Sequence, residues 1–221
     1  MKRFLTALFV VILCYTGYLY HHDERALPPL QNGDIIFQTS WTNQSIAIGL
    51  ASTSLFIHTG IIKQTPQGFS VIEAGDHVHD TPLIPWIHRG ILSRFSIYRY
   101  AGLQPEQTAR IVTAATAYYG EPYNMYFSFE KGSMYCSELV YTAYKDAGIP
   151  LGKVEKISEL NINNRFTKEI IETRWHNYPA CRDHVTNFEQ CYNLILNGDI
   201  ITPSSLAHDA HLARIFDNYP W

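Results

Sequence analysis

A β-hairpin signature places the tightest constraint on the fold of this chain. Residues 56–63 and 69–74 form two runs rich in β-branched and aromatic side chains, separated by Thr65-Pro66-Gln67-Gly68. Proline at the second position and glycine at the fourth are typical of a β-turn, so the two runs are predicted to pair as antiparallel strands. Further strands are expected at residues 35–37 and at residues 95–100, where side chains alternate in polarity. The chain is therefore expected to contain an antiparallel sheet.

Helical signals lie outside the hairpin. Residues 105–119 begin with proline, carry a glutamate in the first turn and precede Gly120, all of which favour a helix. Residues 135–147 have apolar positions at helical spacing and are followed by Gly148, a typical helix end. Shorter helices are expected at residues 44–55, near residues 165–174 and after Pro203. Strands in a hairpin arrangement with helices gathered elsewhere predict an α+β fold, in which an antiparallel sheet packs against helices.

The predicted hairpin brings a histidine and a glutamate together. If Thr65 and Gly68 oppose each other, the numbers of cross-strand partners sum to 133, and Glu73 lies two positions from the partner of His58 on the same face. A register with a sum of 131 would place His58 directly opposite Glu73. In either register the carboxylate can fix the tautomer of the imidazole and raise the basicity of its other nitrogen. The alternative interpretation is a solvated surface contact between the two side chains.

Cys136 is a candidate nucleophile. It lies in the first turn of the helix predicted at residues 135–147, with Ser133 as the expected N-cap. Unpaired N–H groups and the positive end of the helix dipole favour a thiolate there, and a backbone N–H can stabilise an oxyanion. The imidazole of His58 can take the thiol proton, as the base does in a triad of nucleophile, base and orienting residue. The alternative is that Cys136 is a small buried hydrophobic residue.

Length and charge narrow the possible functions. A chain of 221 residues suits one domain of ordinary size, which is expected to span residues 33–221. Lys and Arg number 17 against 20 for Asp and Glu, so the chain lacks the basic excess of a nucleic-acid-binding protein. No nucleic-acid partner is therefore expected.

The N-terminal segment is typical of an export signal. Lys2 and Arg3 precede an uncharged and largely apolar run at residues 4–20. Because this run offers no Ala-x-Ala cleavage site, residues 1–20 are expected to be either an uncleaved membrane anchor or a cleaved signal peptide. Residues 21–32 include two prolines and are predicted to link the membrane to the domain. The positive charges before the run place the rest of the chain outside the cytoplasm.

The cysteines agree with export. Cys181 and Cys191 lie in a polar stretch with nine residues between them, a spacing that suits a local disulfide in an oxidising compartment. The alternative is a pair of free thiols. If they do pair, Cys136 has no disulfide partner in the domain. An unpaired thiol in an exported protein needs another explanation, such as a role in catalysis.

Metal binding is the weaker hypothesis for the remaining histidines. His77 and His79 lie close to Asp76 and Asp80, and His208 and His211 flank Asp209, but neither set has a third and fourth ligand at convincing spacing. These histidines are interpreted as loop or surface residues. No glycine-rich phosphate loop is present either, so neither a metal nor a cofactor is expected.

Four motifs in order resemble the NlpC-type papain-like superfamily. They are Gly33-Asp34-Ile35-Ile36-Phe37, His58-Thr59-Gly60-Ile61-Ile62, Val71-Ile72-Glu73-Ala74 and Tyr135-Cys136-Ser137-Glu138-Leu139-Val140. In most of that superfamily the cysteine helix comes first, whereas here it comes last, which is similar to the circularly permuted branch and to its YiiX-like proteins. Further matches to that branch are Gln44-Ser45, Ala47-Ile48, Thr81-Pro82-Leu83, Trp86-Ile87, Tyr119-Gly120 and Pro122-Tyr123.

The resemblance, which covers residues 33–145, implies a papain-like fold of permuted topology. It also implies a thiol hydrolase in which Cys136 is the nucleophile, His58 the base and Glu73 the residue that orients His58. The expected enzyme is a cell-envelope amidase, peptidase or acyl esterase that forms a thioester intermediate. It is expected on the periplasmic side of the bacterial inner membrane, tethered through its N-terminal segment or released from it.

The expected substrate is either a peptidoglycan peptide or an acyl- or lipid-linked molecule. Tyr135 stands where cell-wall endopeptidases have an aspartate that grips the stem peptide, which weakens the case for a peptidoglycan peptide. The resemblance to the permuted branch implies acyl or lipid substrates. Four tyrosines are expected to line an apolar cleft, namely Tyr119, Tyr123, Tyr126 and Tyr135. The alternative function is a non-catalytic module on the same fold that binds lipid or cell-wall ligands.

Overall fold

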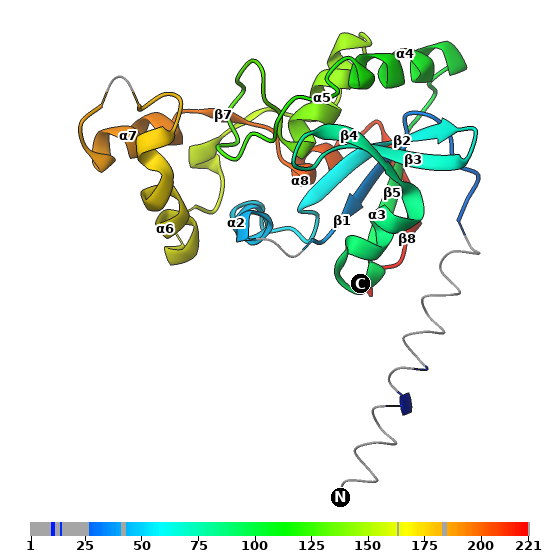
Figure 1. Cartoon of the computed structure of the whole chain (residues 1–221), viewed down its shortest axis with the longest axis horizontal. Coiled ribbons are helices and arrows are strands. Elements are labelled where there is room, and N and C mark those ends of the chain that lie inside the picture. The colour runs from blue at the N-terminus through cyan, green and yellow to red at the C-terminus, as the bar shows by residue number, and fades with distance from the viewer. Residues whose placement is uncertain are drawn as a thin grey trace, which may run out of the picture.

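An antiparallel sheet of six strands is the framework of the described part of the chain (Figure 1). The structure, a computed structural model, describes residues 27–40, 43–162, 164–182 and 185–220, together with Val10, Val11 and Cys14. In spatial order the strands are β4 (Val78–Pro82), β3 (Gly68–Ala74), β2 (His58–Thr65), β1 (Ile35–Gln38), β5 (Phe95–Tyr100) and β8 (Leu212–Asp217). The α+β prediction, with an antiparallel sheet packed against helices, is confirmed.

The hairpin register is one of the two that the sequence allows. Thr65 pairs with Gly68 and Ile61 pairs with Ile72, so the cross-strand sum is 133 and the register of 131 is wrong. Gly68 has a φ of 123°, a backbone conformation that glycine adopts without strain, and the turn closes on it. The strand that begins at His58 is thereby held in a fixed relation to Glu73.

Helices cover both faces of the sheet, and this explains the apolar strands. Ile61 and Ile72 face a layer that includes α4 (Pro105–Thr116) and α5 (Cys136–Asp146), whereas Ile62 and Val71 face α3 (Leu83–Arg89). All four side chains are fully buried. A strand buried on both faces needs apolar residues at successive positions, so the central strands do not alternate in polarity.

The chain between α5 and β8 forms an outer layer of short elements, whose buried apolar residues belong to the same core as one face of the sheet. They are a two-stranded ribbon of β6 (Glu155–Lys156) and β7 (Asp199–Ile200), and the helices α6 (Arg165–Arg174), α7 (Phe188–Leu196) and α8 (Pro203–Ala207). In Figure 1, α6 and α7 lie beyond α2 (Asn43–Ser52), on the side away from α3. The predicted helical pieces at 165–174 and after Pro203 are confirmed, whereas α3, α7, β4 and β8 carry no clear signal in the sequence.

The N-cap of α5 differs from the prediction by two residues. Tyr135, not Ser133, is the N-cap, so Cys136 is the first residue of the helix. The Tyr135 N–H donates to the Glu138 carboxylate at 3.3 Å, the reciprocal contact of a capping box. The first turn of a helix has no intrahelical partners for its N–H groups, and Cys136 lies in that turn.

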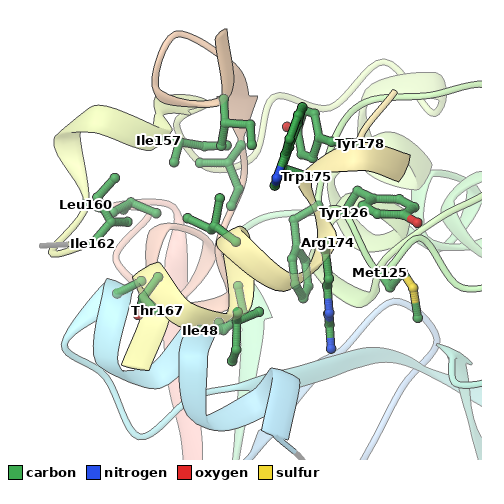
Figure 2. Close-up of a pocket in the computed structure, with 16 residues that line it drawn as sticks. Ile48, Met125, Tyr126, Ile157, Leu160, Ile162, Thr167, Arg174, Trp175 and Tyr178 are labelled. Atoms are coloured by element: carbon green, nitrogen blue, oxygen red, sulfur yellow. The ribbon is translucent and has the colours of Figure 1, made fainter. Parts of the chain in front are cut away.

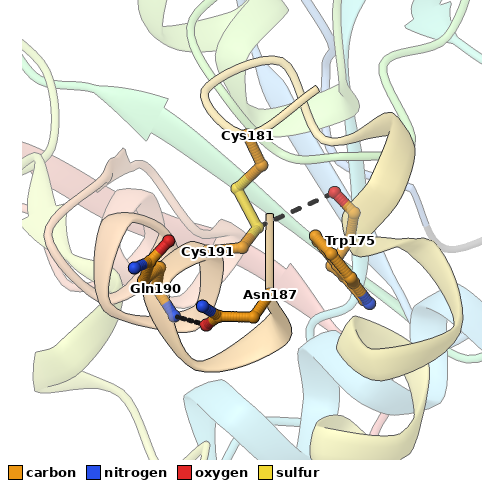
Figure 3. Close-up of a disulfide and its surroundings, with 5 residues drawn as sticks. All are labelled: Trp175, Cys181, Asn187, Gln190 and Cys191. Carbon is orange, nitrogen blue, oxygen red and sulfur yellow. Dashed lines mark hydrogen bonds between the residues drawn. A yellow bond between two sulfur atoms is a disulfide. The ribbon is translucent and has the colours of Figure 1, made fainter. Parts of the chain in front are cut away.

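A disulfide joins the two cysteines of the outer layer, as the sequence predicts (Figure 3). Cys181 and Cys191 are both fully buried, with their Cα atoms 5.3 Å apart. The sulfur of Cys191 lies 3.7 Å from the carbonyl oxygen of Trp175, and the side chain of Asn187 caps α7 by accepting from the N–H of Gln190 at 3.0 Å. The disulfide therefore ties the start of α7 to the segment that follows α6.

Removing the disulfide is expected to destabilise the domain. The bond spans 10 residues, and the loss of loop-closure entropy for a loop of that size corresponds to about 3 kcal/mol of unfolding free energy. We expect the Cys181→Ala/Cys191→Ala double variant to lose about that amount in urea titrations followed by tryptophan fluorescence. Reductant should lower the stability of the wild type and leave the double variant unchanged. Equal stabilities of the two oxidised proteins would contradict the prediction.

The structure describes part of the predicted linker but almost none of the predicted signal or anchor. The predicted signal or anchor at residues 1–20 lies outside the described residues, apart from Val10, Val11 and Cys14. Among the residues that the structure describes, no helix combines the length and the apolar character needed to cross a bilayer. In the predicted linker, residues 27–32 are described and lie against the domain. Leu27 and Leu30 pack on the face that α3 covers.

Candidate active site

The candidate nucleophile lies where a helix end meets the end of a strand. Cys136 is a free thiol, 4% exposed, at the first position of α5. The next turns of α5 bury Leu139, Val140 and Ala143 against the sheet, which fixes the end of the helix. His58 is the first residue of β2 and pairs with Gln38 of β1, so its side chain projects from a face of the sheet at the end of a strand. The helix and the strand can therefore present Cys136 and His58 to each other.

The predicted histidine–glutamate pair forms. The Nε2 atom of His58 lies 2.6 Å from the Oε2 atom of Glu73. The side chain of His58 is 15% exposed, while that of Glu73 is completely buried, so the interpretation as a solvated surface contact is wrong. The indole of Trp86 stacks on the imidazole, with ring centroids 5.8 Å apart. The ring orientation of His58 is thus set by a carboxylate and by an aromatic face.

Glu73 has three further partners that the sequence does not reveal. The Thr81 hydroxyl donates to Oε1 at 2.5 Å, the Trp86 indole N–H donates to Oε2 at 2.9 Å, and the Arg89 guanidinium donates to both oxygens at 2.5 and 2.6 Å. Burial would raise the pKa of Glu73, but the hydrogen bonds from His58 and Thr81 and the charge of Arg89 lower it to about 2. The carboxylate therefore stays ionised in the protein interior.

His58 also contacts the candidate nucleophile. Burial by itself would lower the pKa of His58, but hydrogen bonds to Cys136 and Glu73 outweigh it and raise the pKa to about 9. Because Glu73 engages Nε2, Nδ1 is the nitrogen that remains for Cys136. The imidazole lies between an acid and a thiol, and near neutral pH it carries a proton.

Tyr123, one of the four tyrosines expected at the cleft, lies at the candidate nucleophile. Its hydroxyl is hydrogen-bonded to Cys136, and burial together with the Cys136 sulfur raises the pKa of Tyr123 well above its ordinary value of 10.0. The hydroxyl is therefore a donor at every physiological pH. The motif Tyr119-Gly120-x-Pro122-Tyr123 marks this residue in the sequence, but its hydrogen bond to Cys136 is not predicted.

The four predicted cleft tyrosines separate in the structure. Tyr135 is 1% exposed, and its hydroxyl accepts the N–H of Ile201 at 3.1 Å, so it is a core residue. Tyr119 donates to Asp80 at 2.6 Å on an exposed edge of the sheet. Tyr126 contributes to an apolar pocket, and Tyr123 lies at Cys136. The prediction is thus wrong for Tyr119 and Tyr135 as cleft residues.

The pocket that contains Tyr126 is almost entirely apolar (Figure 2). Its walls come from α2, the loop at residues 125–127 and the outer layer, and Arg174 supplies the one charged side chain of the lining. One wall reaches the nucleophile's neighbours, because Ile200 lines the pocket and the adjoining Ile201 accepts from the Ser137 hydroxyl at 2.8 Å. The loop at residues 125–127 connects to Tyr123 by an edge contact between the Tyr123 and Phe127 rings. The pocket is therefore connected to the Cys136 region through Ile200 and Phe127, although Cys136, His58 and Glu73 are not among the residues that line it.

A second acid near Cys136 is buried without a positive partner in the described structure. Glu138 is 4% exposed, and burial raises its pKa to about 8, although its bond from the Tyr135 N–H acts in the opposite direction. Near neutral pH this carboxyl is mostly neutral. The helix start therefore carries little negative charge that would oppose a thiolate at Cys136.

Comparisons with known proteins agree with this arrangement. A family model described as "permuted papain-like amidase enzyme, YaeF/YiiX, C92 family" matches residues 29–216. YiiX of Escherichia coli strain K12, which is described as uncharacterized, is 35% identical over 147 residues, or 66% of this chain and 73% of that protein. The crystal structure of YiiX from Escherichia coli O157:H7, which is described as a metalloprotein, has 30% identity and a TM-score of 0.76, and the match covers 86% of this chain and 98% of that one.

The order of the strands and the cysteine helix along the chain also matches a permuted papain-like protein. The strands that carry His58 and Glu73 precede the helix that begins at Cys136, which is the permuted order that the resemblance implies. The family model spans most of the domain, including both strands and α5. The chain belongs to the YaeF/YiiX family of permuted papain-like amidases.

Proposed function

We propose that this protein is a cysteine hydrolase of the cell envelope, in which Cys136 attacks the carbonyl group of an amide or ester. One observation carries the proposal: the imidazole of His58 contacts Cys136 on one side and lies 2.6 Å from the buried carboxylate of Glu73 on the other. A nucleophile, a base and an orienting acid in contact are the elements of acyl transfer through a covalent intermediate.

The reaction proceeds in two steps. The Cys136 thiolate attacks the carbonyl carbon, and the tetrahedral intermediate collapses to a thioester as the His58 imidazolium protonates the leaving amine or alcohol. His58, now neutral, takes a proton from water, and the hydroxide attacks the thioester and releases the acid. Glu73 remains ionised throughout and holds the ring in position, because its pKa of about 2 keeps it from accepting the proton.

Two donors are placed to stabilise the oxyanion. The backbone N–H of Cys136 lies in the first turn of α5, where N–H groups have no intrahelical partner. The Tyr123 hydroxyl, hydrogen-bonded to Cys136, is the second. Together they form a two-donor oxyanion hole of the kind that acyl-transfer enzymes use.

The apolar pocket favours an acyl- or lipid-linked substrate over a peptidoglycan peptide. It encloses about 90 Å³, less than the ~150 Å³ of an engineered apolar cavity that holds benzene. A space of that size suits a slim aliphatic group. The site also lacks the aspartate that grips a stem peptide, since Tyr135 occupies that position and is buried in the core. Arg174 at the pocket can pair with an anionic headgroup or carboxylate of the substrate.

Export is part of the same proposal. The basic residues and the apolar run before residue 21 have the pattern of a signal or anchor, and the disulfide of Cys181 and Cys191 suits an oxidising compartment. We therefore place the domain on the periplasmic side of the inner membrane. There it would meet lipids, lipoproteins and cell-wall peptides.

The second candidate is a binding module for lipid or cell-wall ligands on the same fold. The apolar pocket favours it as well, because ligand binding needs no thiol chemistry. The two functions differ in the reactivity of Cys136. An active site makes the thiol reactive through a neighbouring base, whereas a thiol that serves only in packing is inert.

Alkylation of Cys136 is expected to distinguish these functions. We expect iodoacetamide to modify Cys136 rapidly near neutral pH, and the rate to fall at least about tenfold in His58→Ala, because the imidazolium no longer stabilises the thiolate. Mass mapping separates Cys136 from the other free thiol, Cys14, which is the internal control and should react equally in both proteins. Slow reaction of Cys136 in both proteins favours the binding module.

A further inference from the structure

The turn between β3 and β4 gathers three metal-ligand side chains that the sequence pattern alone does not bring together. The Nδ1 atom of His77 lies 2.9 Å from the Oδ1 atom of Asp76, and the Nδ1 atom of His79 lies 3.8 Å from the same oxygen. One ligand atom from each of the three residues lies within 4.8 Å of the others. The two imidazole rings are neighbours, with centroids 4.6 Å apart. Two imidazoles and a carboxylate are ligands that Zn²⁺ prefers.

The second acid of the sequence pattern, Asp80, takes no part. Asp80 accepts from Lys63 and from Tyr119, which leaves the cluster with two histidines and one aspartate. The side chains of Asp76, His77 and His79 are 81%, 48% and 31% exposed, so an ion and its remaining water ligands can reach them. The geometry is thus that of an accessible site with three protein ligands and an open position.

Gly75 provides room for one of these ligands. A Cβ atom built on Gly75 would lie 2.9 Å from the Cε1 atom of the His79 ring, closer than such contacts occur. The backbone of Gly75 does not have a positive φ, so the chain conformation does not demand glycine here, but any larger residue would push the His79 ring from its present position. The residue before the cluster therefore makes space for the imidazole of His79.

We propose that the turn at Asp76–His79 is a Zn²⁺ site, with one carboxylate oxygen of Asp76 and the Nδ1 atoms of His77 and His79 as protein ligands and water completing the shell. At present Nδ1 of His79 is 2.8 Å from the carbonyl oxygen of His77. Metal binding replaces that contact and selects the tautomer with its proton on Nε2. The Nε2 atom then donates to the Thr81 hydroxyl, 3.2 Å away.

The site is coupled to the triad, a consequence that rests on the proposed function. Thr81 donates its own proton to Glu73 at 2.5 Å, so two hydrogen bonds lead from the ligand His79 to the acid that orients His58. Partners of this kind orient ligands and tune metal sites. The turn also supports the oxyanion donor, because the N–H of Tyr123 donates to the carbonyl oxygen of Asp76 at 2.9 Å.

Direct titration tests the site without any assay of activity. The full chain, purified in detergent with the substitution Cys136→Ala so that the thiol cannot bind the ion, is titrated with Zn²⁺ in competition with a chromophoric chelator. Added to this background, His77→Ala, His79→Ala and Asp76→Asn are each expected to weaken binding at least about tenfold, since losses of even indirect partners cost 10–100-fold. The matched control is His211→Ala, which removes an exposed histidine bonded to Asp209 and should change nothing.

A spectroscopic readout separates a built site from loose binding. Co²⁺ in place of Zn²⁺ should give visible absorption bands of a four-coordinate ion, and these bands should disappear in His77→Ala and His79→Ala. Equal Zn²⁺ affinity in the background protein and in these variants would overturn the site. Failure of the proposed hydrolase would instead leave Zn²⁺ binding intact and appear only as slow alkylation of Cys136 in the wild type.

Discussion

Replacing Cys136 with alanine is expected to abolish turnover, with a loss of at least about 10,000-fold in kcat. Losing the nucleophile of a serine protease costs about 10⁶ in kcat, and what remains comes from binding and the oxyanion hole. Here the proposed mechanism forms a thioester on Cys136, so no residue replaces the missing sulfur. The measurement is hydrolysis of p-nitrophenyl esters of increasing acyl length by wild type and Cys136→Ala. Mass spectrometry of the quenched wild type should show the acyl group on Cys136.

Two controls keep this result interpretable. Cys14→Ala removes the other free thiol and should retain full activity, since residue 14 lies in the predicted signal or anchor. The fold should survive Cys136→Ala, because only one sulfur atom is removed at a helix start, and the urea midpoint should stay close to that of the wild type. Full activity in a folded Cys136→Ala protein would end the proposal for this residue.

The local part of the site could be predicted from the sequence. A turn with proline and glycine at defined positions limits the hairpin to two registers, and both of them place His58 and Glu73 on one face. The start of α5 is set by local signals as well, although Tyr135 and not Ser133 is the cap. These features depend on residues that are close together in the chain, where turn and helix preferences act strongly.

The contacts between residues that are far apart in the chain could not be predicted from the sequence. Trp86 and Arg89 hold the Glu73 carboxylate, yet they belong to a short helix that contains Pro85, a residue that disfavours helix in most contexts. The edge strand β4, which carries both His79 and Thr81, is too short and too polar to give a periodic signal in the sequence. The burial of Tyr135 depends on its bond to Ile201, which is 66 residues away in the chain, and no local pattern indicates it.

The missing partners change the expectation for Glu73. From its sequence position alone it is an orienting residue, whereas the structure shows a buried anion with four donors around it. A buried charge without partners is strongly destabilising, and these contacts compensate for it. Glu73 is therefore expected to matter for the stability of the fold as well as for turnover.

Glu73→Gln is expected to lower kcat/KM by roughly 10–1000-fold, as losses of single stabilising groups do at other active sites. The amide keeps the shape of the carboxyl group but not its charge, so His58 loses the anion that favours its imidazolium form. Asp80→Asn is the matched control. This substitution also replaces a carboxylate with an amide, on the neighbouring strand β4. Asp80 contacts Lys63 and Tyr119 and does not contact the triad.

The pH dependence of the two proteins separates a catalytic from a purely structural effect. The wild-type rate should fall as pH rises through about 9, where His58 loses the proton that the leaving group needs. In Glu73→Gln this fall should occur at lower pH, because burial, which lowers the pKa of His58, is then opposed only by Cys136. An unshifted alkaline limb in Glu73→Gln would mean that Glu73 does not act through His58.

Stability should depend on the same carboxylate in the acid range. The pKa of Glu73 falls from 4.5 to about 2 on folding, so its stabilisation is fully present above pH 4.5 and is lost as pH falls through about 2. That shift corresponds to a contribution on the order of 3 kcal/mol. In urea titrations the wild type should therefore exceed Glu73→Gln by a margin that is largest between about pH 4.5 and 6.5. The margin should narrow between pH 4.5 and 2 as Glu73 is protonated, and also above pH 6.5, where His58, whose pKa Glu73 helps to raise to about 9, begins to lose its proton. A margin that is independent of pH would instead assign the loss to altered packing around the amide, because packing does not titrate.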